Sequence, residues 1–259
     1  MIQYLIKMGR ADLHLHTNVS DGFFAPEEIV VSAVKQNLNV IAITDHGRIE
    51  GAVTARKYAR KNNLPIEIIV GEEITTIQGE LVGLFLKKTI PPFLDIVKTA
   101  KLIKEQKGIV FVPHPLRAIT GYSASFESIE KLIQKKLVDA IEIYNFWDYG
   151  SGLPTKRAKK NKIWQLPELG NSDSHHKKTI GKCFTVFPGE NISDLKKAIM
   201  SRKTEPKKQK YLVFKRREEL RHLLLRTKQF VKNNKPSYPG KISFKNRLKY
   251  VIKSRQYHL

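Results

Sequence analysis

The sequence predicts an α/β barrel, a closed sheet of mostly parallel strands with helices packed around it. Short apolar strands alternate with amphipathic helices along the chain, which is typical of parallel sheets. Polar residues gather where the strands end, and a barrel brings those ends to one face. No glycine-rich loop follows the first strand, which disfavours a dinucleotide-binding fold. The 259 residues suffice for one large domain with a sizeable core, since 41% of them are hydrophobic.

Each expected strand is a short apolar run that ends in a turn or a polar motif. The expected strands cover residues 11–16, 39–44, 66–70, 81–86, 108–112, 140–144 and 184–187. The expected helices cover residues 25–36, 50–61, 92–105, 126–136, 153–161 and 192–200. The first helix opens with Pro26, Glu27 and Glu28, and proline and acidic residues favour the first turn of a helix. The run 39–44 is apolar throughout, as expected of a strand covered on both faces.

Positive charge is concentrated at the C-terminal end of the chain. The formal net charge is +23, from 47 Lys and Arg against 24 Asp and Glu. Residues 202–259 hold 19 of these basic residues and 3 of the acidic ones, a net of +16, which leaves +7 for residues 1–201. Such a basic block attracts polyanions, either nucleic acid or an anionic membrane. A lysine-rich composition of the whole chain, or a solvated helix, is the alternative explanation.

We therefore expect two parts, a barrel over residues 1–205 and a basic helical extension over residues 206–259. Within 214–232 the apolar residues Leu220, Leu223 and Leu224 share one helical face, and lysines and arginines occupy the rest. That apolar face either docks on the barrel as a cap or leaves the tail to bind a polyanion directly.

The sequence contains a single cysteine and no targeting signal. Cys183 alone cannot form an intramolecular disulfide or a thiolate metal cluster, and its apolar surroundings predict a buried thiol. Residues 1–7 are too short and too polar for a signal peptide, and no apolar run approaches the length of a membrane span. We therefore expect a cytoplasmic protein, and the sequence leaves its oligomeric state open.

Two histidines alternate on the first expected strand. Residues two apart on a strand point the same way, so His14 and His16 are expected to project side by side. Leu13 and Leu15 are then expected to point away from them into packing. Asp21 follows in a turn, where a strand end could present it as a further ligand. Taken alone, the pair fits a metal site and a chance alternation of histidines equally well.

Matching ligands follow the other strands. Carboxylates and imidazoles stand near strand ends at Asp21, Asp45, His46, Glu72, Glu73, His114, Asp173 and His175. Imidazole and carboxylate without thiolate suit Zn, Mn or Fe in hydrolytic sites. The number of ligands exceeds what one ion needs, so two or three divalent ions that share a bridging carboxylate are expected.

Six short motifs that carry these ligands occur in order along the chain. They are Asp12-Leu13-His14-Leu15-His16-Thr17, Ser20-Asp21-Gly22, Ile43-Thr44-Asp45-His46, Gly71-Glu72-Glu73-Ile74, Pro113-His114-Pro115 and Ser172-Asp173-Ser174-His175. Over residues 10–205 the sequence thereby resembles the PHP (polymerase and histidinol phosphatase) family. The resemblance implies a distorted (β/α)7 barrel with a two- or three-metal site that cleaves phosphoesters. The most similar branch is the small stand-alone phosphoesterases, which act on nucleotide phosphomonoesters or nucleic-acid 5′ ends.

The resemblance also implies a role for each ligand. It divides them among three ions, the first held by His14, His16 and Asp173, the second by Asp21, His46 and His175, and the third by His114. Glu73, rather than Glu72, would bridge the ions. Asp45 would lie behind the ligands and orient a neighbouring imidazole.

One position departs from the family pattern. Family members commonly have a histidine just before the strand that follows the glutamate motif, and Glu80 occupies this place here. A glutamate can still ligate, and its charge would favour a harder ion such as Mn over Zn. Alternatively, the third site is lost and Glu80 is a solvent-facing turn residue.

The expected reaction is attack of a metal-bound hydroxide on the phosphorus of the ester. Arg117 follows His114 by three residues, and its guanidinium suits bidentate contact with phosphate. The alternative is a surface arginine that starts a helix. Asn145 and His176 are further candidates for substrate contact, and the aromatic residues within 144–147 would either stack a base or close the barrel mouth.

These features together predict a metal-dependent phosphoric ester hydrolase, a phosphatase or a 5′–3′ exonuclease-like enzyme. Its expected substrate is a phosphorylated nucleotide or a nucleic acid. One alternative is a phosphatase for a small metabolite such as histidinol phosphate, which the basic tail and the absence of long loop insertions disfavour. The other alternative is a catalytically silent nucleic-acid-binding module, which the nearly complete ligand set disfavours.

Overall fold

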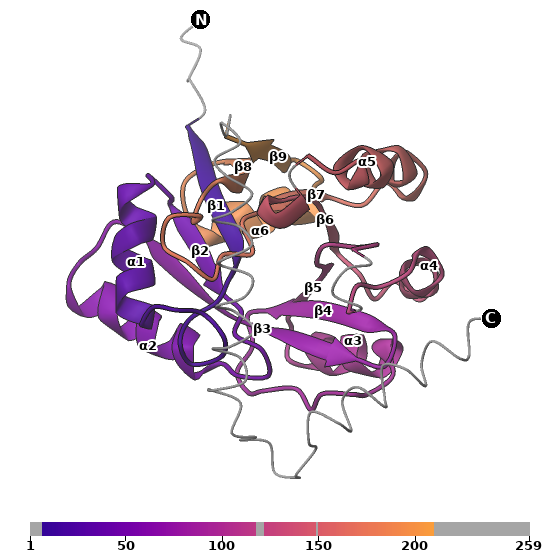
Figure 1. Ribbon diagram of the computed structural model, residues 1–259, viewed down its shortest axis with the longest axis horizontal. Coiled ribbons are helices and arrows are strands. Elements are labelled where there is room, and N and C mark those ends of the chain that lie inside the picture. Colours follow the sequence, from indigo (N-terminus) through magenta and orange to yellow (C-terminus); the bar gives the residue numbers. More distant parts are fainter. Residues whose placement is uncertain (1–6, 118–121, 149, 210–259) are drawn as a thin grey trace, which may run out of the picture.

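The computed structural model describes residues 7–117, 122–148 and 150–209, which form one mixed sheet curled into a nearly closed barrel with helices around it (Figure 1). The strands are β1 (Met8–Leu15), β2 (Val40–Ile43), β3 (Glu67–Thr76), β4 (Gly79–Leu84), β5 (Ile109–Val112), β6 (Ala140–Asn145), β7 (Glu168–Asn171), β8 (Cys183–Pro188) and β9 (Glu205–Lys208). The helices are α1 (Pro26–Lys35), α2 (Glu50–Lys61), α3 (Ile96–Glu105), α4 (Phe126–Gln134), the short η1 (Phe146–Asp148), α5 (Leu153–Trp164) and α6 (Ile192–Met200). The predicted α/β barrel is confirmed.

The direction of two strands differs from the expected parallel arrangement. The strands follow the order β7-β6-β5-β4-β3-β2-β1-β8-β9, with β1, β2 and β3 parallel to one another and β5, β6 and β7 likewise. In contrast, β4 is antiparallel to both neighbours, and β8 is antiparallel to β1. Only Ile77 and Gln78 connect β3 to β4. Two residues can join a hairpin, whereas a parallel crossover needs a dozen or more.

The hairpin changes the position of the glutamate motif. Glu72 and Glu73 lie inside β3, not beyond its end, because β3 continues to Thr76. Side chains alternate along a strand, so the two glutamates point to opposite faces. The Oε2 atom of Glu72 accepts a hydrogen bond from the Ile90 amide at 2.9 Å, and burial raises the pKa of Glu72 to about 8. Glu73 points the other way, into the mouth of the barrel.

Side chains close the gap between β7 and the β1–β8 pair. The Thr185 hydroxyl donates to the Gly170 carbonyl and accepts from the Gly170 amide, both at 3.0 Å. The Asn171 side chain accepts from the Leu13 amide at 2.9 Å, and Asp12 accepts from the Ser172 amide at 3.0 Å. Backbone groups at the seam are therefore satisfied although no continuous ladder joins these strands. A Cβ atom at Gly170 would lie 2.6 Å from the Phe184 carbonyl oxygen, so only glycine fits there.

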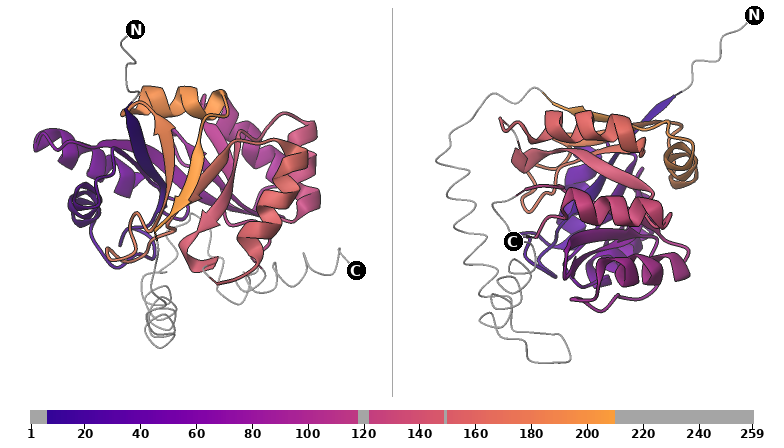
Figure 2. Two further views of the ribbon diagram at one scale, coloured as in Figure 1. Left: turned by 90° about the horizontal axis from the view of Figure 1, so that it is seen from above. Right: turned by 90° about the vertical axis from the view of Figure 1, so that its right-hand side faces the viewer.

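The core is divided between the inside of the barrel and the helices outside it. The inner layer includes Leu13, Phe111 and Phe187, and α6 adds Leu195 and Ile199 to it. Outside, α1 and α2 pack on β2 and β3, while α3, α4 and α5 pack on β4, β5 and β6. Figure 2, seen from above, shows these two groups of helices on opposite sides of the sheet. Cys183 is buried, as predicted.

The first strand is irregular where it carries the histidines. Leu13 packs inside the barrel, whereas Leu15 packs against α1 and α2 outside it. The prediction that these two leucines share a face is therefore wrong. The pairing of β1 with β2 shifts between Asp12 and Leu15, and such an irregularity moves the following side chains to the other face.

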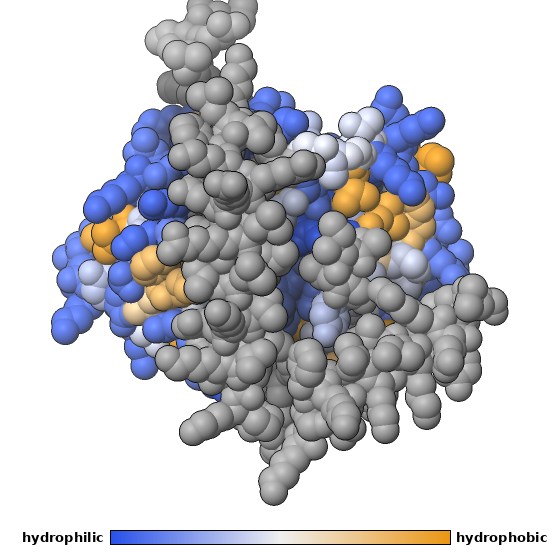
Figure 3. Space-filling model, in the orientation of Figure 1, coloured by the Kyte–Doolittle hydropathy of each residue, from blue (hydrophilic) through white to orange (hydrophobic). Residues whose placement is uncertain are grey.

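The coloured part of the surface in Figure 3 is mostly hydrophilic, with a few apolar areas within it. None of the helices within the described residues is long and apolar enough to cross a membrane. The predicted extension begins inside β9, which pairs with β8. From residue 210 onward it lies outside the described residues, so its helical character and its boundary stay predictions.

Candidate metal centre

The nine predicted metal ligands lie together at the mouth of the barrel. They are His14, His16, Asp21, His46, Glu73, Glu80, His114, Asp173 and His175. The side chain of His46 is 27% exposed, and the other eight residues are buried. Their donor atoms form four overlapping groups, each compact enough to surround one ion. The expected convergence of the strand ends is therefore confirmed.

Glu73 lies at the centre of the cluster. Its Oε2 atom is 3.1 Å from His14 Nε2, 3.2 Å from His16 Nε2 and 3.5 Å from His46 Nδ1. Its Oε1 atom is 3.0 Å from His114 Nε2. A carboxylate that reaches four imidazoles with its two oxygens has the placement of a bridging ligand, the role implied by the family resemblance.

A second group surrounds Asp21. The donor atoms of His16, Asp21, His46 and His175 all lie within 4.8 Å of one another. The Asp21 carboxylate is 3.1 Å from His175 Nε2 and 3.7 Å from His46 Nε2. Three elements distant in sequence thus converge on this position, which matches the ligand set expected for the second ion.

Glu80 belongs to the cluster. It is 5% exposed, and its carboxylate lies 3.7 Å from His114 Nε2 and 3.9 Å from His46 Nδ1. The alternative that Glu80 is a solvent-facing turn residue is therefore wrong. Glu73, Glu80 and His114 form a group of their own, in which glutamate occupies the position that histidine commonly has.

Buried atoms without hydrogen-bond partners show that the cluster suits cations. Both ring nitrogens of His16 and the Oδ1 atom of Asp173 are buried and make no hydrogen bond among the described residues. Buried polar atoms are normally satisfied, so each such atom needs a partner. A divalent ion bound by imidazole and carboxylate would provide one, and the donor set matches Zn, Mn or Fe.

The imidazoles and carboxylates of the cluster shift one another's pKa values. Burial alone would raise the pKa of Asp21, Glu73 and Asp173, but the neighbouring imidazoles hold all three well below the usual range. In Glu80, burial and the charge of Glu73 together raise the pKa well above its usual value. A cation beside Glu80 would therefore favour its ionised form.

A family model described as the PHP domain matches residues 12–235. The chain belongs to the PHP domain family. It is 33% identical over 170 residues to an uncharacterised protein of Methanocaldococcus jannaschii, a match that covers 61% of this chain and 94% of that protein. It is 37% identical over 117 residues to the 5′–3′ exoribonuclease Rnm of Escherichia coli K12, which covers 40% of each protein. The chain thus aligns with less than half of that exoribonuclease.

A solved structure shares the PHP fold with this chain. It is a two-domain protein from Bacteroides vulgatus, described as containing a predicted PHP-like metal-dependent phosphoesterase. The TM-score is 0.67 at 22% identity, over 86% of this chain and 70% of that one. At this identity the similarity concerns the fold alone.

Glu142 is a residue of the PHP site that the sequence interpretation missed. It is fully buried on β6. Its Oε1 atom lies 3.3 Å from His14 Nδ1 and accepts a hydrogen bond from the side-chain Nδ2 of Asn171 at 2.8 Å. Its Oε2 accepts from the backbone amide of His114 at 2.7 Å. Glu142 therefore orients two predicted ligands from behind. A charged residue within the apolar run 140–144 was the available signal.

Arg117 has a different environment from the one predicted. Its Nε and Nη2 atoms donate to the two oxygens of Asp148 at 2.9 and 3.3 Å, and its Nη1 donates to Asp173 Oδ2 at 2.9 Å. The bidentate contact expected for phosphate is thus made with Asp148. Arg117 is 7% exposed, so the alternative of a surface arginine is wrong as well. Through Asp173 it still contacts a predicted ligand.

A second buried arginine continues this chain of charges. Arg157 of α5 is fully buried, and its Nη1 donates to Asp148 Oδ2 at 2.6 Å. Its Nε donates to the Pro115 carbonyl at 2.7 Å, next to His114 in sequence. Arg157 therefore connects helix α5 to η1 and to the loop that carries His114 and Arg117. Sequence reasoning missed both Asp148 and Arg157.

Asp45 does not orient an imidazole, and that prediction is wrong. Its carboxylate accepts from the Thr17 amide at 2.7 Å, from the Thr17 hydroxyl at 2.7 Å and from the Ser20 hydroxyl at 2.6 Å. These contacts hold the loop that carries Asp21. Helix α2 packs close behind, since a Cβ atom at Gly51 would lie 2.1 Å from the Asp45 carboxylate.

The two other predicted substrate contacts lie on either side of the cluster. The Asn145 side-chain amide donates to Glu142 Oε2 at 2.8 Å and to Asp173 Oδ2 at 3.3 Å. The ring of His176 lies 4.9 Å from that of Phe24, at the edge of the site. Direct contact of either residue with substrate stays a prediction. Trp147 donates its indole N–H to the Asp173 carbonyl at 2.8 Å and so belongs to the support of the site.

Proposed function

We propose that this PHP protein is a metal-dependent phosphoesterase that hydrolyses phosphoesters of nucleotides or nucleic acids. The observation that carries the proposal is the buried cluster around Glu73, in which nine ligand side chains converge and three buried polar atoms make no hydrogen bond within the described part of the chain. A purely structural barrel has no need of such a concentration of imidazoles and carboxylates at its mouth. This argues against the alternative of a catalytically silent binding module.

The residues of the chain would divide the work of the reaction. His14, His16 and Asp173 would hold one ion, Asp21, His46 and His175 a second, and Glu80 with His114 a third, while Glu73 joins them. Bound divalent ions would polarise water and neutralise charge on the phosphoryl oxygens. Glu142 and Arg117 would keep His14 and Asp173 in place, which is the usual task of residues behind metal ligands.

The nucleic-acid part of the proposal is supported by charge and by relatives. The net charge of +16 over residues 202–259 favours a polyanionic substrate. Among the relatives are 5′–3′ exoribonucleases, which share only part of their length with this chain. We propose that the basic tail contributes to binding of a nucleic acid. A chain truncated after Gln209 should then bind a 5′-phosphorylated oligonucleotide more weakly and with a smaller dependence on salt. Unchanged binding would exclude this role.

The activity is tested with protein stripped of metal and then loaded with Mn, Zn or Fe. The substrates are 4-nitrophenyl phosphate, its bis ester, nucleoside monophosphates and a 5′-phosphorylated oligonucleotide. We expect metal-dependent phosphate release that Asp173→Ala abolishes and Lys160→Gln leaves unchanged, since Lys160 pairs with Glu130 of α4 and is neither a predicted ligand nor a predicted substrate contact. Stoichiometric metal binding without hydrolysis of any substrate would refute the enzymatic proposal.

A further inference from the structure

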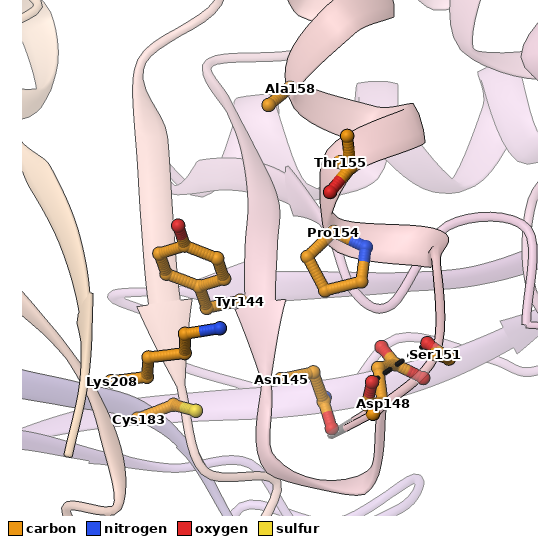
Figure 4. A pocket seen from close by; sticks show the side chains of 10 residues that line it. Tyr144, Asn145, Asp148, Ser151, Pro154, Thr155, Ala158, Cys183 and Lys208 are labelled. Carbon is orange, nitrogen blue, oxygen red and sulfur yellow. Dashed lines mark hydrogen bonds between the residues drawn. The ribbon is translucent and has the colours of Figure 1, made fainter. Parts of the chain in front are cut away.

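A cavity of about 260 Å³ lies between helix α5 and the strands β6, β8 and β9. Figure 4 shows Tyr144, Cys183 and Lys208 on one side of it, Pro154, Thr155 and Ala158 on the other, and Asn145, Asp148 and Ser151 at one end. None of these residues is a predicted metal ligand. The volume is just below the range of pockets for drug-sized ligands, so the cavity suits a group about as large as one ring system.

The cavity adjoins the metal centre through two of its lining residues. Asn145 lines the cavity and donates to Asp173 Oδ2 at 3.3 Å. Asp148 lines it too and holds Arg117, which in turn donates to Asp173 at 2.9 Å. The cavity and the metal centre thus share a wall formed by Asn145 and Asp148, with Asp173 on the side of the cluster. An organic group bound in the cavity would lie close to a phosphoester at the cluster.

The lining favours a flat ring. The Tyr144 side chain provides a half-buried aromatic surface, with the ammonium of Lys208 5.2 Å from its ring centroid. Carbon surfaces of Pro154 and Ala158 face it from α5. Aromatic and aliphatic walls of this kind bind the faces of nucleobases with little regard to sequence. The exposed lysine adds positive charge, which complements an anionic substrate.

The polar groups at the end of the cavity are already engaged. The side-chain oxygen of Asn145 (Oδ1) accepts a hydrogen bond from the Trp147 backbone amide at 3.0 Å. The Ser151 hydroxyl donates to the Asp148 carbonyl at 2.7 Å and accepts from the Leu153 amide at 3.3 Å. These side chains are poorly placed to discriminate the hydrogen-bonding edges of a base. At this end of the cavity the lining therefore contributes little to the recognition of ring edges.

We propose that this cavity binds the nucleobase of the substrate and accepts purines and pyrimidines alike. The proposal deepens the function proposed for the metal centre and rests on it for the reaction. Binding of the base in the cavity does not depend on the proposed phosphoesterase function, because a nucleoside without phosphate should enter the cavity of a protein that holds no metal. This difference allows the two proposals to fail separately.

The test fills the cavity without altering the metal ligands. Ala158→Leu places a larger side chain inside it, and Lys159→Leu adds the same side chain at an exposed position of the same helix. Adenosine and uridine are titrated into each protein in the presence of a chelator, with binding followed by NMR or calorimetry. We expect both nucleosides to bind the unaltered chain and Lys159→Leu equally, and to bind Ala158→Leu about tenfold more weakly or not at all.

The kinetic arm uses the metal-loaded protein. Ala158→Leu should raise KM for nucleoside monophosphates about tenfold while hydrolysis of 4-nitrophenyl phosphate changes less than twofold. Tyr144→Ala should act in the same direction, and thermal melting confirms that both variants fold. Equal nucleoside binding by Ala158→Leu and the unaltered chain, or a parallel loss for both substrate types, would overturn the proposal. Nucleoside binding that Ala158→Leu abolishes, in a protein without hydrolytic activity, would support the cavity and refute the phosphoesterase.

Discussion

Asp148 lies between two buried guanidiniums, and replacing it tests how the metal centre is supported. It accepts hydrogen bonds from Arg117 and Arg157, and all three side chains are at most 8% exposed. Asp148→Asn keeps the shape of the side chain and removes its charge. Arg117 would then keep Asp173 as a carboxylate partner, whereas Arg157 would keep none that it contacts among the described residues. Removing one partner of a buried ion pair costs about 3–5 kcal/mol, because the remaining charge is left uncompensated in a medium that solvates it poorly.

The same substitution should weaken metal binding. Arg117 loses its bidentate partner and keeps only Asp173, so it competes more strongly with an ion for that carboxylate. Residues behind metal ligands typically contribute a factor of about 10–100 in metal affinity. We therefore expect the free energy of unfolding of the metal-free protein to fall by about 3–5 kcal/mol and the affinity for Mn to fall at least about tenfold.

Urea denaturation in a chelator measures the first quantity, and calorimetric titration of the folded variant with Mn measures the second. Lys160→Gln is the matched control, because its ion pair with Glu130 is exposed to solvent and should contribute little to stability. If Asp148→Asn loses no more stability than this control and binds Mn normally, the chain of charges does not support the centre.

Three further predictions concern single side chains. Glu142→Gln should lower Mn affinity about 10–100-fold with little change in fold, because a glutamine side chain supports His14 and the His114 loop less strongly than the carboxylate does. Calorimetric titration with Mn measures this affinity. Glu80→His should shift metal preference from Mn toward Zn, measured by elemental analysis after competition between the two ions. Asp95 caps α3 by accepting a hydrogen bond from the Val97 amide. Partial burial raises the pKa of Asp95, but the hydrogen bonds from Val97 and Gln78 lower it below its usual value. Asp95→Ala should therefore cost about 1 kcal/mol above pH 4, a difference that shrinks as the pH falls through the lowered pKa.

The motifs of the metal centre could be predicted because each ligand lies in a short local pattern. His14 and His16 alternate on a strand, and His46 and His114 come shortly after apolar runs, so that a barrel brings them together. The irregularity of β1 could not be predicted in this way. It arises from pairing with β2, a strand more than twenty residues away.

The residues behind the ligands could not be assigned from local patterns. Glu142 and Arg157 are single charged residues within a strand and a helix, and nothing nearby in sequence indicates what they contact. Their partners come from other elements, as with Arg157 and the Pro115 carbonyl. Arg117 illustrates the same limit. Its position after His114 was informative, but the carboxylate that occupies its guanidinium lies 31 residues away on η1.

The charge balance of the connected network bears on the number of ions and on the substrate. Six carboxylates contact the cluster or its supporting arginines, namely Asp21, Glu73, Glu80, Glu142, Asp148 and Asp173. Two guanidiniums oppose them, so with neutral imidazoles and every carboxylate ionised the network carries four negative charges. Two divalent ions would balance these charges. A third, held with the help of Glu80, would leave an excess of two positive charges, which a bound hydroxide and an anionic phosphoester would offset.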